Sequence, residues 1–165
     1  MRGQAATGVS RVAPLALGKE FDRKERRVVD GDSDALDRGH EIVTTVLVAA
    51  HANTLRALIA EGVGTGARPL RGYKIVVDAG NGSGGFFATD VLEPLGADIS
   101  GSQFLDPDGT FPNHSPNPED PEAMASASRA TSASGADLGV VFDTDVDRSA
   151  VIDASGVAFN RNRLI

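Results

Sequence analysis

The chain has 165 residues, enough for one compact domain with an additional arm, and its apolar fraction of 41% excludes wholesale disorder. It contains no cysteine, which excludes a disulfide framework and a thiolate metal site and fits an intracellular protein. The net charge of −7 is unevenly shared: residues 1–68 hold 10 basic and 9 acidic side chains, whereas residues 69–165 hold 6 and 14. The acidic charge of residues 69–165 makes nucleic acid a poor partner. For the same reason, this part of the chain needs a cation if it binds phosphorylated compounds.

The first 41 residues show no pattern of a folded element. Residues 1–19 contain Arg2, Arg11 and Lys19 but no acidic side chain, which weakly resembles an organellar transit peptide. Such a peptide would place the protein in a plastid; the alternative is a disordered N-terminus on a cytoplasmic protein. Residues 20–41 mix charges of both signs and are predicted to form a solvated loop. We therefore expect residues 1–41 to be a disordered or transit-like segment.

A stripe of apolar residues with helical spacing follows, and it predicts a helix over residues 42–61. The stripe comprises Val43, Val46, Leu47, Ala50 and Leu58. The glycines of residues 62–66 and then Pro69 end this pattern, so residues 42–68 are predicted to be a helix and a linker. The longest apolar run, residues 42–50, is far shorter than a bilayer span, and we expect no transmembrane segment and no membrane partner.

After the linker, short apolar strands alternate with helices, which indicates an α/β domain. The predicted strands cover residues 74–78, 99–105, 138–142 and a hairpin of 149–153 with 157–160. The predicted helices cover residues 86–95 and 120–134, ended by Gly96 and Gly135. We expect a three-layer α/β/α domain with a mixed sheet over residues 69–165.

The strand predicted at residues 138–142 runs directly into Asp-Thr-Asp-Val-Asp-Arg, residues 143–148. Alternate residues of an extended backbone project to the same side, so Asp143, Asp145 and Asp147 should converge. At about 7 Å and an effective dielectric near 20, each adjacent pair repels by about 2.4 kcal/mol, which should raise the pKa of each carboxylate. A bound cation would offset this repulsion, and an all-oxygen donor set favours Mg²⁺ over Mn²⁺ or Ca²⁺. We therefore predict a metal site at these three aspartates.

Three other interpretations of this loop compete with a magnesium site. An EF-hand loop needs Gly at its sixth and Glu at its twelfth position, where this chain has Arg148 and Ala154. A phosphatase of the haloacid-dehalogenase type also begins with a strand and Asp-x-Asp, but it usually has Thr or Val in place of Asp147 and needs further Lys and Asp motifs. A solvated acidic turn is the plainest alternative, although three alternating aspartates and an arginine after an apolar strand are unusual for one.

A glycine-rich turn, residues 80–85, satisfies the G-x-G-x-x-G pattern of a dinucleotide-binding site. Such a site also wants an acidic residue at the end of the next strand. Asp98 comes before the predicted strand and Asp106 after it, so the fit is loose, and a tight strand-to-helix turn is the alternative. The histidines show no metal-ligand spacing. We expect His114 to fix its loop by hydrogen bonds rather than to act in acid–base catalysis.

Taken in chain order, four segments resemble the α-D-phosphohexomutases, the phosphoglucomutase/phosphomannomutase family. Residues 135–148 resemble the family's Gly-Ala-Asp-Leu-Gly strand and the Asp-Gly-Asp-Ala-Asp-Arg loop after it. Residues 76–82 resemble its opening strand and turn, residues 92–97 its Leu-Gly-Ala helix end, and residues 107–119 its Asp-Gly-x-Phe-Pro-x-His-x-Pro-x-Pro segment. The resemblance runs over residues 70–165 and is nearest the plant and algal, phosphoglucosamine-mutase-like branch, in which Thr follows the first Asp.

The resemblance implies the second α/β/α domain of a Mg²⁺-dependent intramolecular phosphotransferase, an isomerase of carbohydrate metabolism that interconverts sugar 1-phosphates and 6-phosphates. In that family three aspartates bind Mg²⁺ together with a phosphoserine of the preceding domain. Asp143, Asp145 and Asp147 match those metal ligands. Arg148 matches a catalytic arginine beside the metal and the transferring phosphoryl group. The implied partner of the full-length enzyme is a phosphorylated hexose.

The chain also departs from the family pattern. Thr144 and Val146 replace the commoner Gly and Ala, which keeps the ligands but adds bulk to the loop. The phosphoserine loop, the sugar-specificity loop and the C-terminal phosphate-binding loop have no counterpart, and residues 42–68 resemble at most a remnant of the first domain. We therefore expect a mutase fragment, truncated at the C-terminal end of its second domain and inactive alone. The alternative is a non-catalytic metal- or partner-binding domain.

Overall fold

The structure, a computed structural model, describes residues 33–64 and 66–160. The chain divides into two units, residues 1–41 and 42–165, and the first is described as helical backbone from Ser33 onward. The transit-like segment predicted at residues 1–19 lies outside the described residues, as does the predicted loop up to residue 32.

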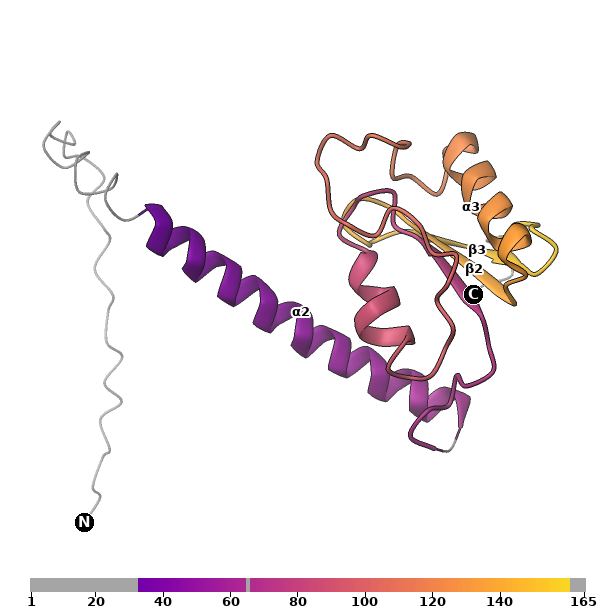
Figure 1. Cartoon of the computed structure of the whole chain (residues 1–165), viewed down its shortest axis with the longest axis horizontal. Coiled ribbons are helices and arrows are strands. Elements are labelled where there is room, and N and C mark those ends of the chain that lie inside the picture. The colour runs from indigo at the N-terminus through magenta and orange to yellow at the C-terminus, as the bar shows by residue number, and fades with distance from the viewer. Residues whose placement is uncertain (1–32, 65, 161–165) are drawn as a thin grey trace, which may run out of the picture. The chain divides into compact units, whose positions relative to one another are not determined.

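Helix α2, Ser33–Val63, is the first described element (Figure 1). It contains the helix predicted over residues 42–61 but begins earlier, so the prediction of a loop is wrong from Ser33 onward. Of residues 33–40 the structure describes only the helical backbone.

The outer surface of α2 is unusually apolar. Over Glu41–Val63 the helix is long and apolar enough to cross a membrane, with a mean hydropathy of 1.5, and 6% of its most apolar window is buried. Its exposed apolar side chains include Ile42, Val43, Val46 and Leu47. Core helices of soluble proteins and signal sequences have the same properties, so one such helix is weak evidence. The absence of a membrane partner stays a prediction.

Three strands form a mixed sheet in the order β1-β2-β3. Strand β1, Ile75–Asp78, runs parallel to β2, Leu138–Phe142. Strand β3, Ser149–Asp153, runs antiparallel to β2. A parallel pair needs a long crossover connection, and residues 79–137 supply it. Because parallel strands end at the same edge, Asp78 after β1's apolar run and Asp143 after β2 lie at one edge of the sheet.

The helix predicted over residues 86–95 is a shorter π-helix, η1, Phe87–Leu92. Pro94 has no N–H to donate to the carbonyl of Asp90, four residues earlier, so the regular α-helical ladder cannot continue there. Instead the N–H of Glu93 donates to the carbonyl of Ala88 at 3.0 Å, and the guanidinium of Arg56 from α2 donates to the freed Asp90 carbonyl.

The strand predicted over residues 99–105 is not regular. Its neighbourhood contributes isolated bridges, from Asp98 to Lys74 and from Gln103 to Asp78. Gly101 adopts a left-handed backbone with φ 103°, and the Ser102 hydroxyl accepts the N–H of Val77 at 3.0 Å. A side chain thus replaces a backbone acceptor, and the chain follows β1 without forming a full ladder.

Helix α3, Pro121–Ser134, matches the predicted helix closely. The Asp120 side chain caps it by accepting the N–H of Glu122 at 2.8 Å, and Gly135 ends it with φ 63°. It covers one face of the sheet through a cluster of apolar side chains. The cluster comprises Met124, Ala127, Val141, Ala150 and Ile152.

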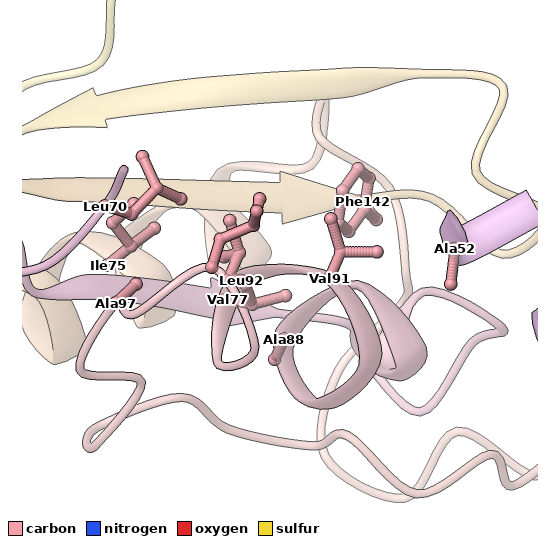
Figure 2. Packing of buried hydrophobic residues seen from close by; sticks show 10 residues of the cluster. Ala52, Leu70, Ile75, Val77, Ala88, Val91, Leu92, Ala97 and Phe142 are labelled. Carbon is pink, nitrogen blue, oxygen red and sulfur yellow. The ribbon is translucent and has the colours of Figure 1, made fainter. Parts of the chain in front are cut away.

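The opposite face of the sheet packs against η1, and side chains from the C-terminal half of α2 join the same buried cluster. Figure 2 shows Phe142 of the sheet beside Val91 of η1, with Ala52 of α2 farther along the same buried cluster, which also contains Val77. Alternation along each strand separates the two faces, since Val141 joins the α3 side and Phe142 the η1 side. The predicted three-layer α/β/α domain with a mixed sheet is confirmed.

Candidate metal centre

Strand β2 places an acidic cluster at its carboxyl end. Asp143 follows the buried Phe142 and is 1% exposed, whereas Asp145 and Asp147 face solvent. Each of the three offers a carboxylate oxygen, and these oxygens lie within 4.8 Å of one another. The structure therefore brings together the three aspartates that the sequence analysis selected.

Contacts between its two ends close the loop that carries these aspartates. The N–H of Asp143 donates to the carbonyl of Arg148 at 3.2 Å, and the N–H of Arg148 donates to Asp143 Oδ1 at 3.1 Å. Between them Val146 adopts a left-handed backbone with φ 68°. That conformation is costly for a β-branched residue, so the loop holds local strain at its tip.

Arg148 lies against the cluster and against a second loop. Its Nε donates to Asp143 Oδ2 at 2.9 Å and lies 3.6 Å from Asp147 Oδ1. Its Nη1 is 3.4 Å from Oδ1 of Asn117, which belongs to the proline-rich loop at residues 106–118. The guanidinium therefore neutralises part of the acidic charge and links the two loops.

The pKa values of the cluster do not all move in the expected direction. A hydrogen bond with Asp143, and repulsion from Asp145 and Asp143, raise the pKa of Asp147 above its ordinary value. Burial acts to raise the pKa of Asp143 too, but hydrogen bonds from the Arg148 backbone, from Asp147 and from the Arg148 side chain outweigh it, and that pKa is lowered. The prediction that each carboxylate titrates above its ordinary value is therefore wrong for Asp143.

The donor set of the cluster suits a hard divalent cation. Three carboxylate oxygens and no nitrogen or sulfur ligand are the preference of Mg²⁺, Mn²⁺ or Ca²⁺. The three oxygens lie within 4.8 Å of one another, a proximity that suits a single cation held by all three.

The glycine-rich turn after β1 lies directly beside the acidic loop. The N–H of Ser83 donates to the carbonyl of Thr144 at 2.9 Å, and the Ser83 hydroxyl donates to the same oxygen at 3.0 Å. The neighbouring glycines pack against other parts of this chain. A Cβ at Gly84 would meet the Phe142 ring, and a Cβ at Gly85 would overlap the Leu105 carbonyl. The space that a dinucleotide phosphate would need at these glycines is thus filled, which favours the tight-turn interpretation.

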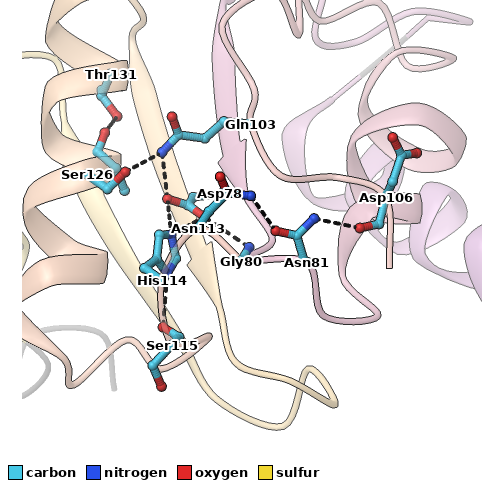
Figure 3. A network of polar contacts seen from close by, with 11 residues as sticks. Asp78, Gly80, Asn81, Gln103, Asp106, Asn113, His114, Ser115, Ser126 and Thr131 are labelled. Atoms are coloured by element: carbon cyan, nitrogen blue, oxygen red, sulfur yellow. Dashed lines mark hydrogen bonds and ion pairs between the residues drawn. The ribbon is translucent and has the colours of Figure 1, made fainter. Parts of the chain in front are cut away.

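A buried polar network joins β1 to the proline-rich loop (Figure 3). Nε2 of His114 lies 3.0 and 3.1 Å from the two carboxylate oxygens of Asp78, and Nδ1 lies 2.9 Å from the carbonyl of Ser115. Asp78 also accepts the Gly80 N–H at 3.0 Å and the Gln103 amide at 2.7 Å. Both ring nitrogens of His114 therefore have a hydrogen-bond partner in the buried network. His114 fixes its loop by hydrogen bonds, as predicted.

Ser83 and Asn117 are neighbours of the acidic loop that the sequence did not indicate. Both lie in segments whose motifs were recognised, the glycine-rich turn and the proline-rich loop, but no local pattern shows that either touches residues 143–148. The one available signal was topological. Turns that follow neighbouring parallel strands meet at the same edge of a sheet.

Comparison with known proteins agrees with this fold and site. Residues 41–156 match the family model described as "Phosphoglucomutase/phosphomannomutase, alpha/beta/alpha domain II". The chain is 42% identical over 86 residues to a phosphoglucomutase of Neisseria meningitidis, covering 52% of this chain and 18% of that protein. It is 38% identical over 99 residues to a phosphomannomutase/phosphoglucomutase of Pseudomonas aeruginosa, covering 60% of this chain and 20% of that protein.

A crystal structure of a phosphoglucomutase/phosphomannomutase family protein from Burkholderia thailandensis matches with a TM-score of 0.52 and 40% identity, over 55% of this chain and 20% of that one. The chain thus spans about a fifth of the length of these relatives. They are bacterial, and the closer resemblance to the plant and algal branch stays a prediction. The matched residues contain the whole sheet, α3 and the acidic loop, and on this basis the chain belongs to the phosphoglucomutase/phosphomannomutase family, of which it carries α/β/α domain II.

Proposed function

We propose that this chain supplies the metal-binding loop of a Mg²⁺-dependent phosphohexomutase. The observation that carries the proposal is the acidic cluster, whose three carboxylate oxygens lie within 4.8 Å of one another at the end of β2. Asp143, Asp145 and Asp147 would hold the cation. Bound there, Mg²⁺ would supply positive charge to a phosphoryl group that passes between two oxygens.

Arg148 would act as the catalytic arginine of this loop. Its Nε is held by Asp143 and its Nη1 by Asn117. Because the guanidinium is already fixed from two sides, it loses little further side-chain entropy when it donates to phosphoryl oxygens. It also remains charged throughout the physiological pH range. Its pKa is raised, first by the hydrogen bond to Asp143 and then by attraction to the surrounding carboxylates.

The names of the relatives support a substrate class for the proposal. Their names include phosphoglucomutase, phosphomannomutase and, in Acidovorax, phosphoglucosamine mutase, so we propose a phosphorylated hexose as the partner of the complete enzyme and no nucleic acid or membrane partner. The alternative, a non-catalytic metal-binding domain, uses the same aspartates but needs no catalysis by Arg148. We also propose plastid targeting by residues 1–19, which a fluorescent fusion with and without these residues would test.

The metal site can be tested on the full chain with Mn²⁺ as the probe, by water-proton relaxation. We expect binding at about millimolar affinity, because the loop provides three protein ligands and water must complete the octahedron. Asp145→Asn should weaken this binding at least ten-fold, since it removes one charged ligand. Asp90→Asn, which changes an exposed carboxylate outside the cluster, is the matched control. Equal affinity in the two variants would refute the metal site.

A further inference from the structure

The acidic loop is held from outside at the residue between two of its aspartates. The carbonyl of Thr144 accepts both the N–H and the hydroxyl of Ser83, at 2.9 and 3.0 Å. Two donors from one residue on one oxygen fix that oxygen in position and direction. Because Thr144 lies between Asp143 and Asp145, its peptide group sets how these two carboxylates are spaced.

Gly82 lies so close to the Thr144 peptide that a residue with a Cβ would not fit there without displacement. A Cβ built there would lie 2.9 Å from the Thr144 oxygen and 3.0 Å from its Cα. Both are backbone atoms, which cannot rotate away as a side chain can, so a Cβ would have to push the loop or the turn aside. The backbone of Gly82 lies outside the left-handed region, so it is space and not conformation that requires glycine here.

The glycine-rich turn is itself anchored to the sheet. The N–H of Gly82 donates to the carbonyl of Ala79 at 2.7 Å, and the N–H of Asn81 donates to the carbonyl of Phe104 at 2.8 Å. Buried Asp78 accepts the N–H of Gly80. The acidic loop, by contrast, is exposed at Asp145. The turn therefore offers the acidic loop an anchored partner.

We propose that Gly82 and Ser83 are positioning residues for the metal loop: they hold the Thr144 peptide, and through it the spacing of Asp143 and Asp145. This rests on the proposed metal function of those aspartates. It also gives a role to the G-x-G-x-x-G pattern, in which the second glycine makes room for the acidic loop. Groups that orient metal ligands affect affinity without touching the metal, and their removal typically costs about 10- to 100-fold.

The test uses the full chain and Mn²⁺ alone. Gly82→Ala should weaken Mn²⁺ binding at least ten-fold, because its Cβ displaces the Thr144 peptide. Ser83→Ala should weaken it about three-fold, since the backbone N–H still donates to Thr144. Gly109→Ala is the matched control: a Cβ there meets no atom within 4 Å, and the affinity should not change. Wild-type affinity in both Gly82→Ala and Ser83→Ala would overturn the proposal.

The positioning role of Gly82 and Ser83 can be tested separately from metal binding, by amide chemical shifts in ¹H–¹⁵N spectra of the metal-free chain. Gly82→Ala and Ser83→Ala should shift the amides of Thr144 and Asp145, whereas Gly109→Ala should leave them in place. If the wild-type chain binds no Mn²⁺, the metal function fails, yet these shifts still support the positioning role. Unshifted amides in a folded Ser83→Ala variant would overturn the positioning role. If Gly82→Ala does not fold, the Ser83→Ala variant alone provides this test.

Discussion

In the acidic loop, two neighbouring carboxylates respond in opposite ways to the same surroundings. The exposed Asp147 shares a hydrogen bond with Asp143 and is repelled by both other aspartates, which raises its pKa. The buried Asp143 receives the hydrogen bonds of Arg148, and these lower its pKa despite its burial. Sequence spacing alone predicted equal repulsion and a raised pKa for each carboxylate. The hydrogen bonds from Arg148 make the difference, because they stabilise the charged form of Asp143.

The first prediction concerns the pH dependence of stability without metal. A raised folded-state pKa means that the native state holds the Asp147 proton more tightly, so this group's contribution to stability falls as pH rises through that pKa. Asp147→Asn should therefore raise the melting temperature at neutral pH, and the gain should vanish in acid, below about pH 3. Thermal melts across this range in EDTA provide the measurement.

Asp143→Asn should show the opposite sign. A lowered folded-state pKa gives stability that is present above the ordinary pKa and lost as pH falls through the folded one. The variant should melt below the wild-type chain at neutral pH, with the difference closing in acid. Shifts of the same sign for Asp143→Asn and Asp147→Asn would contradict the assignment of opposite pKa shifts.

Val146 supports a second prediction at the residue scale. Its φ of 68° disfavours any residue with a Cβ, by about 1 kcal/mol or more relative to glycine. Val146→Gly should therefore be more stable than Val146→Ala by about 1 kcal/mol in urea unfolding; comparing the two cancels the packing lost with the valine methyls. Position 109 provides the control, because there Ala should equal or exceed the native Gly. Ala equal to Gly at position 146 would argue against the left-handed loop tip.

At the scale of elements, a buried hydrogen bond between His114 and Asp78 holds the proline-rich loop to β1. Asp78 is fully buried and the His114 side chain nearly so, and the ring nitrogen lies 3.0 Å from the carboxylate. Asn117, three residues beyond His114, reaches Arg148 from the same loop. The proline-rich loop therefore connects the core of the sheet, through His114, to the acidic cluster, through Asn117.

The third prediction is that His114→Ala destabilises the chain by about 3 kcal/mol, because it deprives the buried Asp78 carboxylate of a hydrogen-bond partner. His51→Ala is the matched control: that ring is exposed and, among the described residues, packs against Phe86, so its loss should cost within about 0.5 kcal/mol. Urea unfolding of both variants measures the difference. Similar losses for the two histidines would show that the loop is held by other contacts.

At the scale of the whole molecule, the chain covers about a fifth of each relative, and its described residues form one domain-II sheet with its two helical layers. Phosphoryl transfer depends on groups that are positioned around the substrate from several sides. In our proposal the acidic loop and Arg148 supply one of these sides, and we expect a complete mutase to need further groups.

Our fourth prediction is that the isolated chain shows no mutase turnover on glucose 1-phosphate or mannose 1-phosphate, even with Mg²⁺ and a hexose bisphosphate. A coupled assay, with a full-length relative as the positive control, provides the measurement. Activity that persists in an Asp145→Asn preparation would indicate contaminating host enzyme. Turnover by the wild-type chain that this substitution abolishes would show that the chain is catalytically sufficient, contrary to our expectation.

The sequence alone determined the elements whose signals are local. The apolar run of β2, the Asp120 and Gly135 caps of α3, and the alternation of three aspartates all act through near neighbours, so they could be predicted before the fold was known. The extent of η1 was less predictable, because Pro94 and Arg56 together alter its hydrogen bonding.

Only the tertiary structure decided which groups surround the acidic loop. Ser83 and Thr144 are 61 residues apart in the chain, His114 and Asp78 are 36 apart, and Asn117 and Arg148 are 31 apart. No periodicity or motif connects such pairs, because the crossover between parallel strands determines which loops meet at the sheet edge. The lowered pKa of Asp143 and the requirement for glycine at position 82 follow from these contacts, so residue types alone could not predict them.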